Sequence, residues 1–226
     1  MEILYEDNHI IAVNKSNSDI VQVDKTGDLS LEDKIKAYIK EKYNKPGDVF
    51  LGVVHRLDRP VSGVVVFART SKALTRMNEM FKKKDVKKTY WAIVKEKPVK
   101  SEDILNHYIV RDQKKNKSFA FDKEVKNSKL ASLSYKIKAM AENYTLLEID
   151  LHTGRHHQIR CQLSKIGCPI KGDLKYGFSR SNPDGGISLH SRKIEFIHPV
   201  KKENIIIMAD PPQDNLWDYF NKIIDN

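Results

Sequence analysis

The sequence predicts an α+β fold built on a large mixed, mainly antiparallel β-sheet that is flanked by helices and loops. Segments with strand patterns outnumber those with helix patterns, and only some connections are long enough to be crossovers. The run GVVVFA at 63–68 is apolar at consecutive positions, as in a strand covered on both faces, so it belongs near the centre of the sheet. No glycine-rich nucleotide loop follows a strand, which disfavours the doubly wound class.

The first half of the chain alternates predicted strands and helices. The elements expected are a strand over 9–15, a helix over 29–43, the strand over 63–68, a helix over 70–84 and a strand over 87–97. Ser30 is a suitable N-cap for the first helix, and lysines end the second helix, where the helix dipole favours them. In the strand over 87–97, Tyr90 lies on one face and Trp91 on the other.

The second half begins with a polar stretch at 106–128, which predicts short strands and exposed loops. The alternating segment 144–155 predicts a strand, and a helix over 156–167 follows it. A hairpin of 193–200 with 203–212 and a short amphipathic helix complete the chain. Because no internal repeat or linker is visible, we expect residues 1–226 to form a single domain.

The charge balance predicts a polyanionic partner. Lys and Arg number 40 against 30 Asp and Glu, a net charge of +10, and RNA or DNA is the commonest partner of such a surface. Membrane association and simple solubility remain as alternatives. Cys161 and Cys168 match no common zinc spacing, and the N-terminus shows neither a signal peptide nor a membrane span. We therefore expect a cytoplasmic protein.

Asp58 is the first candidate for chemistry. It lies between Arg56 and Arg59, directly before the predicted buried strand. Neighbouring guanidinium groups would keep its carboxylate ionised and available as a nucleophile or base. The alternative is an ordinary turn whose charges are solvated, since surface pairs of Arg and Asp are common and weak. The local sequence by itself favours that alternative.

Tyr90 is a second candidate, and the segment 152–160 is a third. A tyrosine on a strand can stack on a base or act as an acid or base, although packed core is the more frequent role. In the third segment, His156 and Arg160 are four residues apart, so we expect them to share one face of the predicted helix near its start, which indicates an anion site. Three histidines in this segment could also bind a metal ion, but no carboxylate lies beside them in the sequence. The basic runs at 82–88 and 111–117 suit either phosphate contacts or a solvated surface.

The order and spacing of three motifs are more specific than any of them alone. They are HRLD-x-x-x-SG from His55, K-x-Y-x-A from Lys88 and TGR-x-HQIR from Thr153. Together they resemble the motifs of the RluA-like family of RNA pseudouridine synthases. The resemblance covers nearly the whole chain, from 3–15 to 196–212, and includes the segments 166–177 and 187–199.

The resemblance implies the pseudouridine synthase catalytic fold and the isomerisation of uridine in RNA, with no cofactor or metal. Asp58 matches the catalytic aspartate, Tyr90 the active-site tyrosine and Arg160 the basic residue that pairs with the aspartate. Arg56 matches the arginine that helps to displace the target base from the RNA. We expect the remaining contacts to RNA from Arg155, His157 and Lys88.

Three positions depart from the family pattern. The family has Lys-Pro-x-Gly after the first strand, whereas Lys15 is followed here by Ser16 and Asn17, which leaves the shape of that loop open. Val61 replaces a threonine and Cys168 replaces a histidine, without touching the proposed chemistry.

From the resemblance we expect the chain to start directly with the catalytic region, without the small N-terminal RNA-binding domain that many family members carry. We therefore expect a monomer that binds a stem-loop of tRNA or ribosomal RNA through this one domain. The alternative function is an RNA-binding protein of the same fold that acts as an RNA chaperone or assembly factor without catalysis.

Overall fold

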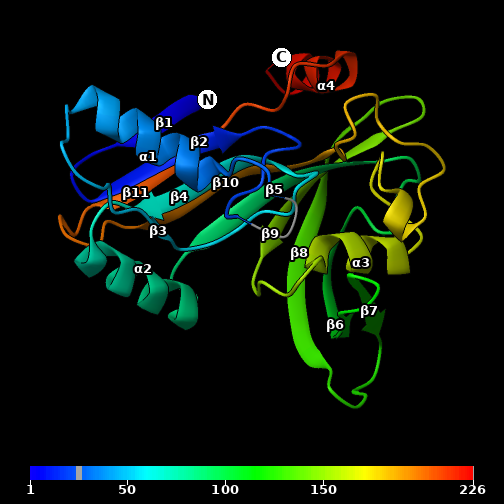
Figure 1. Ribbon diagram of the computed structural model, residues 1–226. Helices are drawn as coiled ribbons and strands as arrows, with labels where there is room; N and C mark the ends of the chain where they lie inside the picture. The colour runs from blue at the N-terminus through cyan, green and yellow to red at the C-terminus, as the bar shows by residue number, and fades with distance from the viewer. Residues whose placement is uncertain (24–26, 226) are drawn as a thin grey trace.

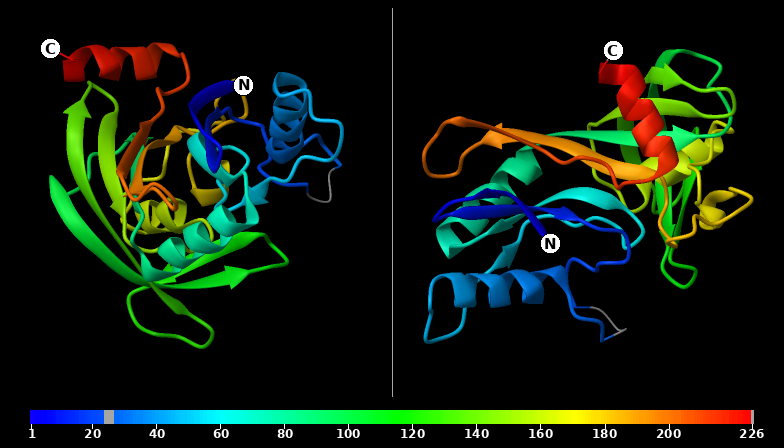
Figure 2. Two further views of the ribbon diagram at one scale, coloured as in Figure 1. Left: turned by 90° about the vertical axis from the view of Figure 1, so that its left-hand side faces the viewer. Right: turned by 90° about the horizontal axis from the view of Figure 1, so that it is seen from above.

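The computed structural model describes residues 1–23 and 27–225, which form one continuous sheet with helices on both faces (Figures 1 and 2). The strands are β1 (Glu2–Glu6), β2 (Ile10–Lys15), β3 (Gly52–Val53), β4 (Ser62–Ala68), β5 (Lys87–Val94), β6 (Glu102–Asp112), β7 (Lys117–Phe121), β8 (Lys129–Met140), β9 (Thr145–Leu151), β10 (Leu189–Ile197) and β11 (Asn204–Met208). The helices are α1 (Leu31–Lys42), α2 (Ser71–Lys83), α3 (Gln158–Lys165), the 3₁₀ turn η1 (Leu174–Tyr176) and α4 (Asn215–Asp225). No helix in these described ranges is long and apolar enough to span a bilayer.

The strand order is β1-β2-β4-β10-β5-β9-β8-β6-β7, with β3 paired to β4 and β11 paired to β10. β4 and β10 run parallel and the other paired strands run antiparallel. The predicted α+β class with a large, mainly antiparallel sheet is thus confirmed. All seven residues of β4 are buried, as its consecutive apolar residues predicted.

Several predicted elements and boundaries were wrong, most of them in the second half of the chain. The stretch 106–128 was expected to hold short strands, but its first part belongs to the eleven-residue strand β6. β6 alternates buried and exposed residues because one face packs on the core while the other faces water. β8, with twelve residues, and the N-terminal strand β1 were not predicted. The helix expected over 156–167 begins only at Gln158.

The sheet separates two layers of core. On one face, α1 and α3 pack on β2, β4, β5, β8 and β9, and this cluster includes Ile35, Ile159 and Tyr90. On the other face, Met77 of α2 packs with residues of β2, β4, β10 and β11. Further along the same face, Trp217 and Phe220 of α4 cover Trp91. The first face, between α3 and the ends of β4 and β5, carries the site described below.

Gly63 is required where β4 meets β10. Its φ is +113°, and a Cβ atom added there would lie 2.3 Å from the carbonyl oxygen of Ser191. The parallel pairing of Ser62 with His190 and of Gly63 with Ser191 is possible only at this close approach. The glycine therefore fixes the start of β4, and with it the loop that carries Asp58.

The loop after β2 keeps a left-handed residue at the position where the family pattern has glycine. Ser18 has φ of +73°, and its amide donates to the carbonyl of Arg59 at 3.2 Å. We expect Ser18→Gly to raise the free energy of unfolding by about 0.5–1 kcal/mol, because relief of left-handed strain outweighs the extra entropy of an unfolded glycine. Chemical denaturation measures the change. Ser16→Gly, in the same loop but without positive φ, should be neutral or destabilising; a gain equal to that of Ser18→Gly would contradict the argument.

A buried neutral histidine links stability to pH. His190 is 0% exposed, with Ser62 Oγ 2.9 Å from Nδ1 and the Ala209 carbonyl 2.9 Å from Nε2. Burial lowers its pKa to about 4, below the usual value near 6.5 in an unfolded chain. Between pH 4 and pH 6.5, the imidazole is protonated in the unfolded state but stays neutral in the folded state. We therefore expect His190 to destabilise the fold by about 1.4 kcal/mol per unit as pH falls through this window. His190→Gln should remove that part of the slope, and an unchanged slope would contradict it.

Candidate active site

One pocket of about 390 Å³ collects all seven predicted site residues. They are Arg56, Asp58, Lys88, Tyr90, Arg155, His157 and Arg160. The loop before β4 brings the first two, β5 brings the next two, and the segment from the end of β9 into α3 brings the rest. Residues more than a hundred positions apart in the sequence thus face one cavity.

Asp58 is paired with Arg160 across this pocket. Arg160 Nη1 donates to Asp58 Oδ2 at 3.1 Å, and the arginine is 5% exposed. The other edge of the guanidinium is held by Asp173, through Nε to Oδ2 at 2.7 Å and Nη2 to Oδ1 at 2.9 Å. The centroid of the Tyr176 ring lies 5.0 Å from the guanidinium carbon of Arg160, so the ring stabilises the same cation. The bidentate contact with Asp173 fixes the direction in which Arg160 meets Asp58.

Lys15, at the end of β2, supports the Asp58 loop from below. Its side chain is 0% exposed, and Nζ donates to the carbonyls of Ser16, Arg59 and Val61 at 3.0, 3.0 and 2.7 Å. Two of these carbonyls lie within three residues of Asp58. Burial lowers the pKa of Lys15 to about 8, while nearby Asp19 and Asp58 oppose that shift. The lysine thus adds three hydrogen bonds to the few backbone contacts of a loop that belongs to no strand or helix.

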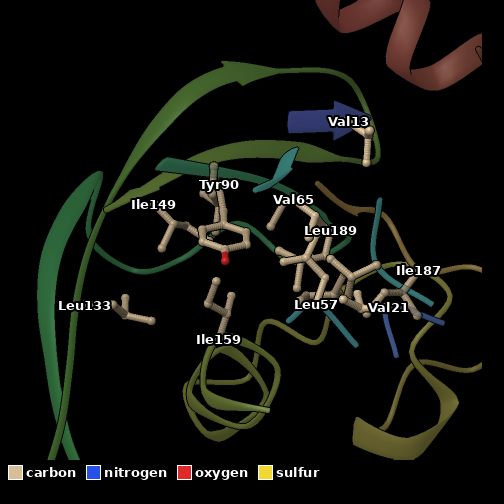
Figure 3. Packing of buried hydrophobic residues seen from close by; sticks show 14 of the residues in the cluster. Val13, Val21, Leu57, Val65, Tyr90, Leu133, Ile149, Ile159, Ile187 and Leu189 are labelled. Atoms are coloured by element: carbon tan, nitrogen blue, oxygen red, sulfur yellow. The ribbon is translucent and has the colours of Figure 1, made fainter. Parts of the chain in front are cut away.

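Tyr90 stands on β5 with its ring at the back of the pocket. It is 7% exposed, and burial raises its pKa to about 12, so the hydroxyl stays protonated at neutral pH. Figure 3 shows the hydroxyl directed from the sheet toward Ile159 of α3, between Ile149 and Leu189. The ring therefore offers a fixed, uncharged wall to a planar group that enters the pocket.

The three histidines of the 152–160 segment do not converge. His152 lies near the hydroxyls of Ser132 and Ser134, whereas His156 and His157 stack with ring centroids 3.7 Å apart. His156 and Arg160 were expected to share a helical face, which is wrong because α3 begins after both histidines. His157 occupies the N-cap position with φ of +51° and makes no side-chain cap.

Cationic side chains line the mouth of the pocket. Arg56, Arg155 and Arg111 are exposed there, and Lys88 is half-buried with Nζ 5.8 Å from the Phe81 ring centroid. Burial lowers the pKa of Lys88, and within the described chain no carboxylate pairs with it. Arg59 instead makes a surface ion pair with Asp28 at 2.8 Å, so it is a solvated charge.

Sequence reasoning missed several residues of this site. Arg111 was visible only as part of a basic run, and its place on the pocket-facing side of β6 follows from the sheet register. Lys15, Asp173 and Tyr176 were noticed only as parts of longer segments. Their burial beside Asp58 and Arg160 depends on packing between distant elements, which a linear pattern does not display.

Comparison with known proteins identifies similar chains. The family model described as RNA pseudouridylate synthase matches residues 9–165. An uncharacterized RNA pseudouridine synthase of Bacillus subtilis is 32% identical over 219 residues, which are 95% of this chain and 70% of the relative. A ribosomal large subunit pseudouridine synthase C of Rickettsia typhi is 34% identical over 213 residues, 93% of this chain and 68% of the relative.

Solved structures share the fold over nearly the whole chain. The human RNA pseudouridylate synthase domain containing 4 aligns with a TM-score of 0.79 at 23% identity, covering 99% of this chain and 93% of that one. The human RNA pseudouridylate synthase domain containing 1 aligns with a TM-score of 0.75 at 22% identity, covering 97% and 86%. At these identities the likeness concerns the architecture.

Proposed function

Because the chain belongs to the RNA pseudouridylate synthase family, we propose that it isomerises specific uridines in tRNA or ribosomal RNA to pseudouridine, with Asp58 as the catalytic group. The observation that carries this proposal is the pairing of Asp58 with Arg160, 3.1 Å apart and 102 residues distant in sequence, beside the ring of Tyr90. A solvated surface turn would not place its carboxylate against a buried arginine.

The reaction is a rearrangement within one nucleotide. The Asp58 carboxylate assists the cleavage of the bond between uracil N1 and ribose C1′, the base rotates, and C5 joins C1′. The proton lost from C5 is balanced by the proton gained at N1, so the product is an isomer of the substrate. Arg160 orients the Asp58 carboxylate through its contact with Oδ2. The buried Tyr90 ring stacks on the uracil while it is held away from the RNA.

The substrate base must leave its RNA stack to reach Asp58. Such extrusion costs a few kcal/mol, which contacts elsewhere must offset. Arg56 is placed at the mouth of the pocket to enter the space that the base leaves, and Lys88, Arg155 and Arg111 meet phosphates there. His157 lies deeper and is 8% exposed, so its expected RNA contact is limited to a nucleotide inside the pocket.

The proposal includes a single catalytic domain that acts as a monomer on an RNA stem-loop. Relatives named for the ribosomal large subunit favour ribosomal RNA as the target class. The alternative of an RNA chaperone with the same fold is disfavoured by the intact set of Asp58, Tyr90 and Arg160 in one pocket.

The decisive experiment incubates the recombinant protein with unmodified transcripts of tRNA and ribosomal RNA in a buffer without added metal. Pseudouridine is then located by chemical mapping, and the same mapping is carried out on total RNA from cells with and without the gene. We expect new pseudouridine at a small number of positions in both assays. RNA binding without conversion of any uridine would support the chaperone instead.

A further inference from the structure

The proton of the His157 imidazole can be located from its neighbours. The Ser118 amide donates to the Tyr176 hydroxyl oxygen at 2.8 Å, and that oxygen lies 2.9 Å from His157 Nδ1. For the hydroxyl proton itself, Nδ1 is the one acceptor in hydrogen-bonding distance within the described chain. Tyr176 therefore donates to Nδ1, and the ring proton of a neutral His157 lies on Nε2.

His157 is neutral and firmly held. Burial and the positive charge of Arg160 lower its pKa to about 2. The ring is stacked on His156, and the backbone adopts φ of +51°, a left-handed conformation that packing must maintain in a residue other than glycine. The strained backbone directs the imidazole at Asp58: Nε2 lies 3.5 Å from Oδ2.

We propose that His157 is a positioning residue whose Nε2–H, oriented by the Tyr176 hydroxyl, becomes the second donor to Asp58 Oδ2 when substrate fills the pocket. The contact of 3.5 Å is longer than a formed hydrogen bond, and such contacts commonly shorten in the substrate complex. Arg160 already donates to Oδ2, while Oδ1 has no donor within the described chain. Oδ1 is then the oxygen that acts on the ribose. This inference rests on the proposed role of Asp58.

A neutral second donor differs chemically from a second cation. It orients the carboxylate through a hydrogen bond but adds no charge that would stabilise the ground state and weaken the nucleophile. The nearby Arg111 and Lys175 both disfavour a charged His157, as does its neighbour His156. Tyr176 thus has two tasks, since its ring covers Arg160 and its hydroxyl sets the tautomer of His157.

The experiment combines Tyr176→Phe with a direct observation of the tautomer. Side-chain ¹⁵N NMR of histidine-labelled protein should show His157 protonated on Nε2 and uncharged down to about pH 5, and Tyr176→Phe should remove this preference. Tyr176→Phe should lower kcat about tenfold with KM within twofold, because geometry rather than substrate binding is lost. Tyr219→Phe, which removes the hydroxyl of a 47% exposed tyrosine of α4, is the matched control and should leave kcat unchanged. Glutamine has an N–H donor and leucine has none, so we expect His157→Gln to retain part of kcat and His157→Leu to lose it. This difference would support the role of Nε2–H as a donor.

Two results would overturn the inference. One is a wild-type His157 that carries its proton on Nδ1 or titrates near pH 6, and the other is an unchanged kcat in Tyr176→Phe. The NMR measurement needs no turnover, so it is independent of the proposed function. Failure of Asp58 as the catalytic group would show separately, as activity that persists in Asp58→Asn.

A different observation concerns the outer face of β6, β7 and β8, which is the face opposite α3. Phe119 and Phe121 of β7 are 38% and 39% exposed, and Leu130 of β8 is 49% exposed. The register pairs Tyr108 of β6 with both Phe121 and Leu130, so these side chains form one apolar strip, the outer strip. In Figure 2 (left), α4 is the helix on this side of the sheet, at the far end from β7.

The rings of the outer strip are accessible, and their surroundings are basic. Within the described chain, none of Tyr108, Phe119 and Phe121 stacks on another ring, and the Lys117 ammonium lies 5.7 Å from the centroid of the Phe119 ring. Residues 111–129, which include β7 and its two flanking turns, carry seven Lys or Arg against three Asp or Glu. Lys117 also lies 5.1 Å from the Tyr176 ring centroid, which connects the strip to the edge of the active site.

We infer that the outer strip stacks unpaired bases of the RNA whose target uridine occupies the pocket. Exposed aromatic rings on a sheet, surrounded by lysines, are suited to base stacking with phosphate contacts. A second copy of this chain would meet an equally basic surface, which disfavours it as the occupant. This inference rests on RNA being the substrate.

The test uses a fluorescently labelled oligoadenosine of twelve nucleotides, which contains no uridine and so reports binding without catalysis. Phe119→Ala with Phe121→Ala should weaken its affinity about tenfold or more, because each stacked base contributes roughly 1–3 kcal/mol. Tyrosine at both positions should retain the affinity. Ile206→Ala with Met208→Ala, exposed apolar residues of β11, should change nothing. Equal affinity of the alanine and wild-type proteins, or loss of a dimer in the alanine protein, would overturn the inference.

Discussion

Asp58→Asn is expected to abolish isomerisation, with a rate loss on the order of 10⁴-fold or more. Asparagine keeps the size of the side chain but removes the negative charge that we propose acts on the ribose. Arg160 retains its bidentate contact with Asp173, so the substitution does not leave a buried cation without a partner. The variant should therefore fold and bind RNA, and single-turnover conversion of a mapped substrate RNA is the measurement.

The matched control for this variant is Asp28→Asn. Asp28 is a half-exposed surface carboxylate that pairs with Arg59, the neighbour of Asp58 in sequence. Loss of the same charge there should change the rate by less than twofold. Turnover by Asp58→Asn at the wild-type rate would remove Asp58 from the mechanism.

Lys15→Met is expected to lower the free energy of unfolding by about 3 kcal/mol and to reduce kcat by about 100-fold. Methionine fills a similar volume, but the carbonyls of Ser16 and Val61 lose the donor, and that of Arg59 keeps only the Ser18 amide. An unpaired buried acceptor costs roughly 1–3 kcal/mol, and release of the buried lysine charge offsets part of the sum. The rate falls because the loop that carries Asp58 is no longer held. Denaturation and single-turnover assays measure the two effects.

Lys34→Met provides the comparison for Lys15→Met. Lys34 is 38% exposed and pairs with Asp19 on the surface, so its replacement should change stability by less than about 0.5 kcal/mol. If the free energy of unfolding of Lys15→Met lies within 1 kcal/mol of the wild-type value, the loop does not depend on this lysine. The rate should be compared at a temperature at which both proteins are fully folded.

The sequence was sufficient to predict the fold class and seven residues that line the pocket, but not Arg111 or the side chains that support the site. Motif spacing identified Asp58, Tyr90 and Arg160 because each belongs to a specific short pattern. Lys15 looks like the polar end of a strand, and its burial arises only when the loop at 59–61 closes over it. A linear pattern does not contain that contact.

The strands of the second half were harder to predict for a related reason. β6 and β8 each bury one face, but many of their outward residues are Lys, Asn, Ser and Glu, which resemble loop composition. Their stability comes from pairing with each other and with β9 rather than from local preference. Its position in the motif predicted that His157 contacts RNA. Its contacts with Tyr176 and Asp58 follow only from the tertiary structure.

The parallel contact between β4 and β10 has a consequence for how the protein folds. Ser62 pairs with His190, so the chain must close a loop of more than a hundred residues before the sheet is continuous. Contacts of such high sequence separation slow folding, since the entropy of loop closure is lost before the contact forms. During synthesis, the segment that contains Asp58 emerges long before Arg160 and β10. A partly made chain therefore holds a carboxylate without its cation, and catalytic competence should arise only in the last stage of folding.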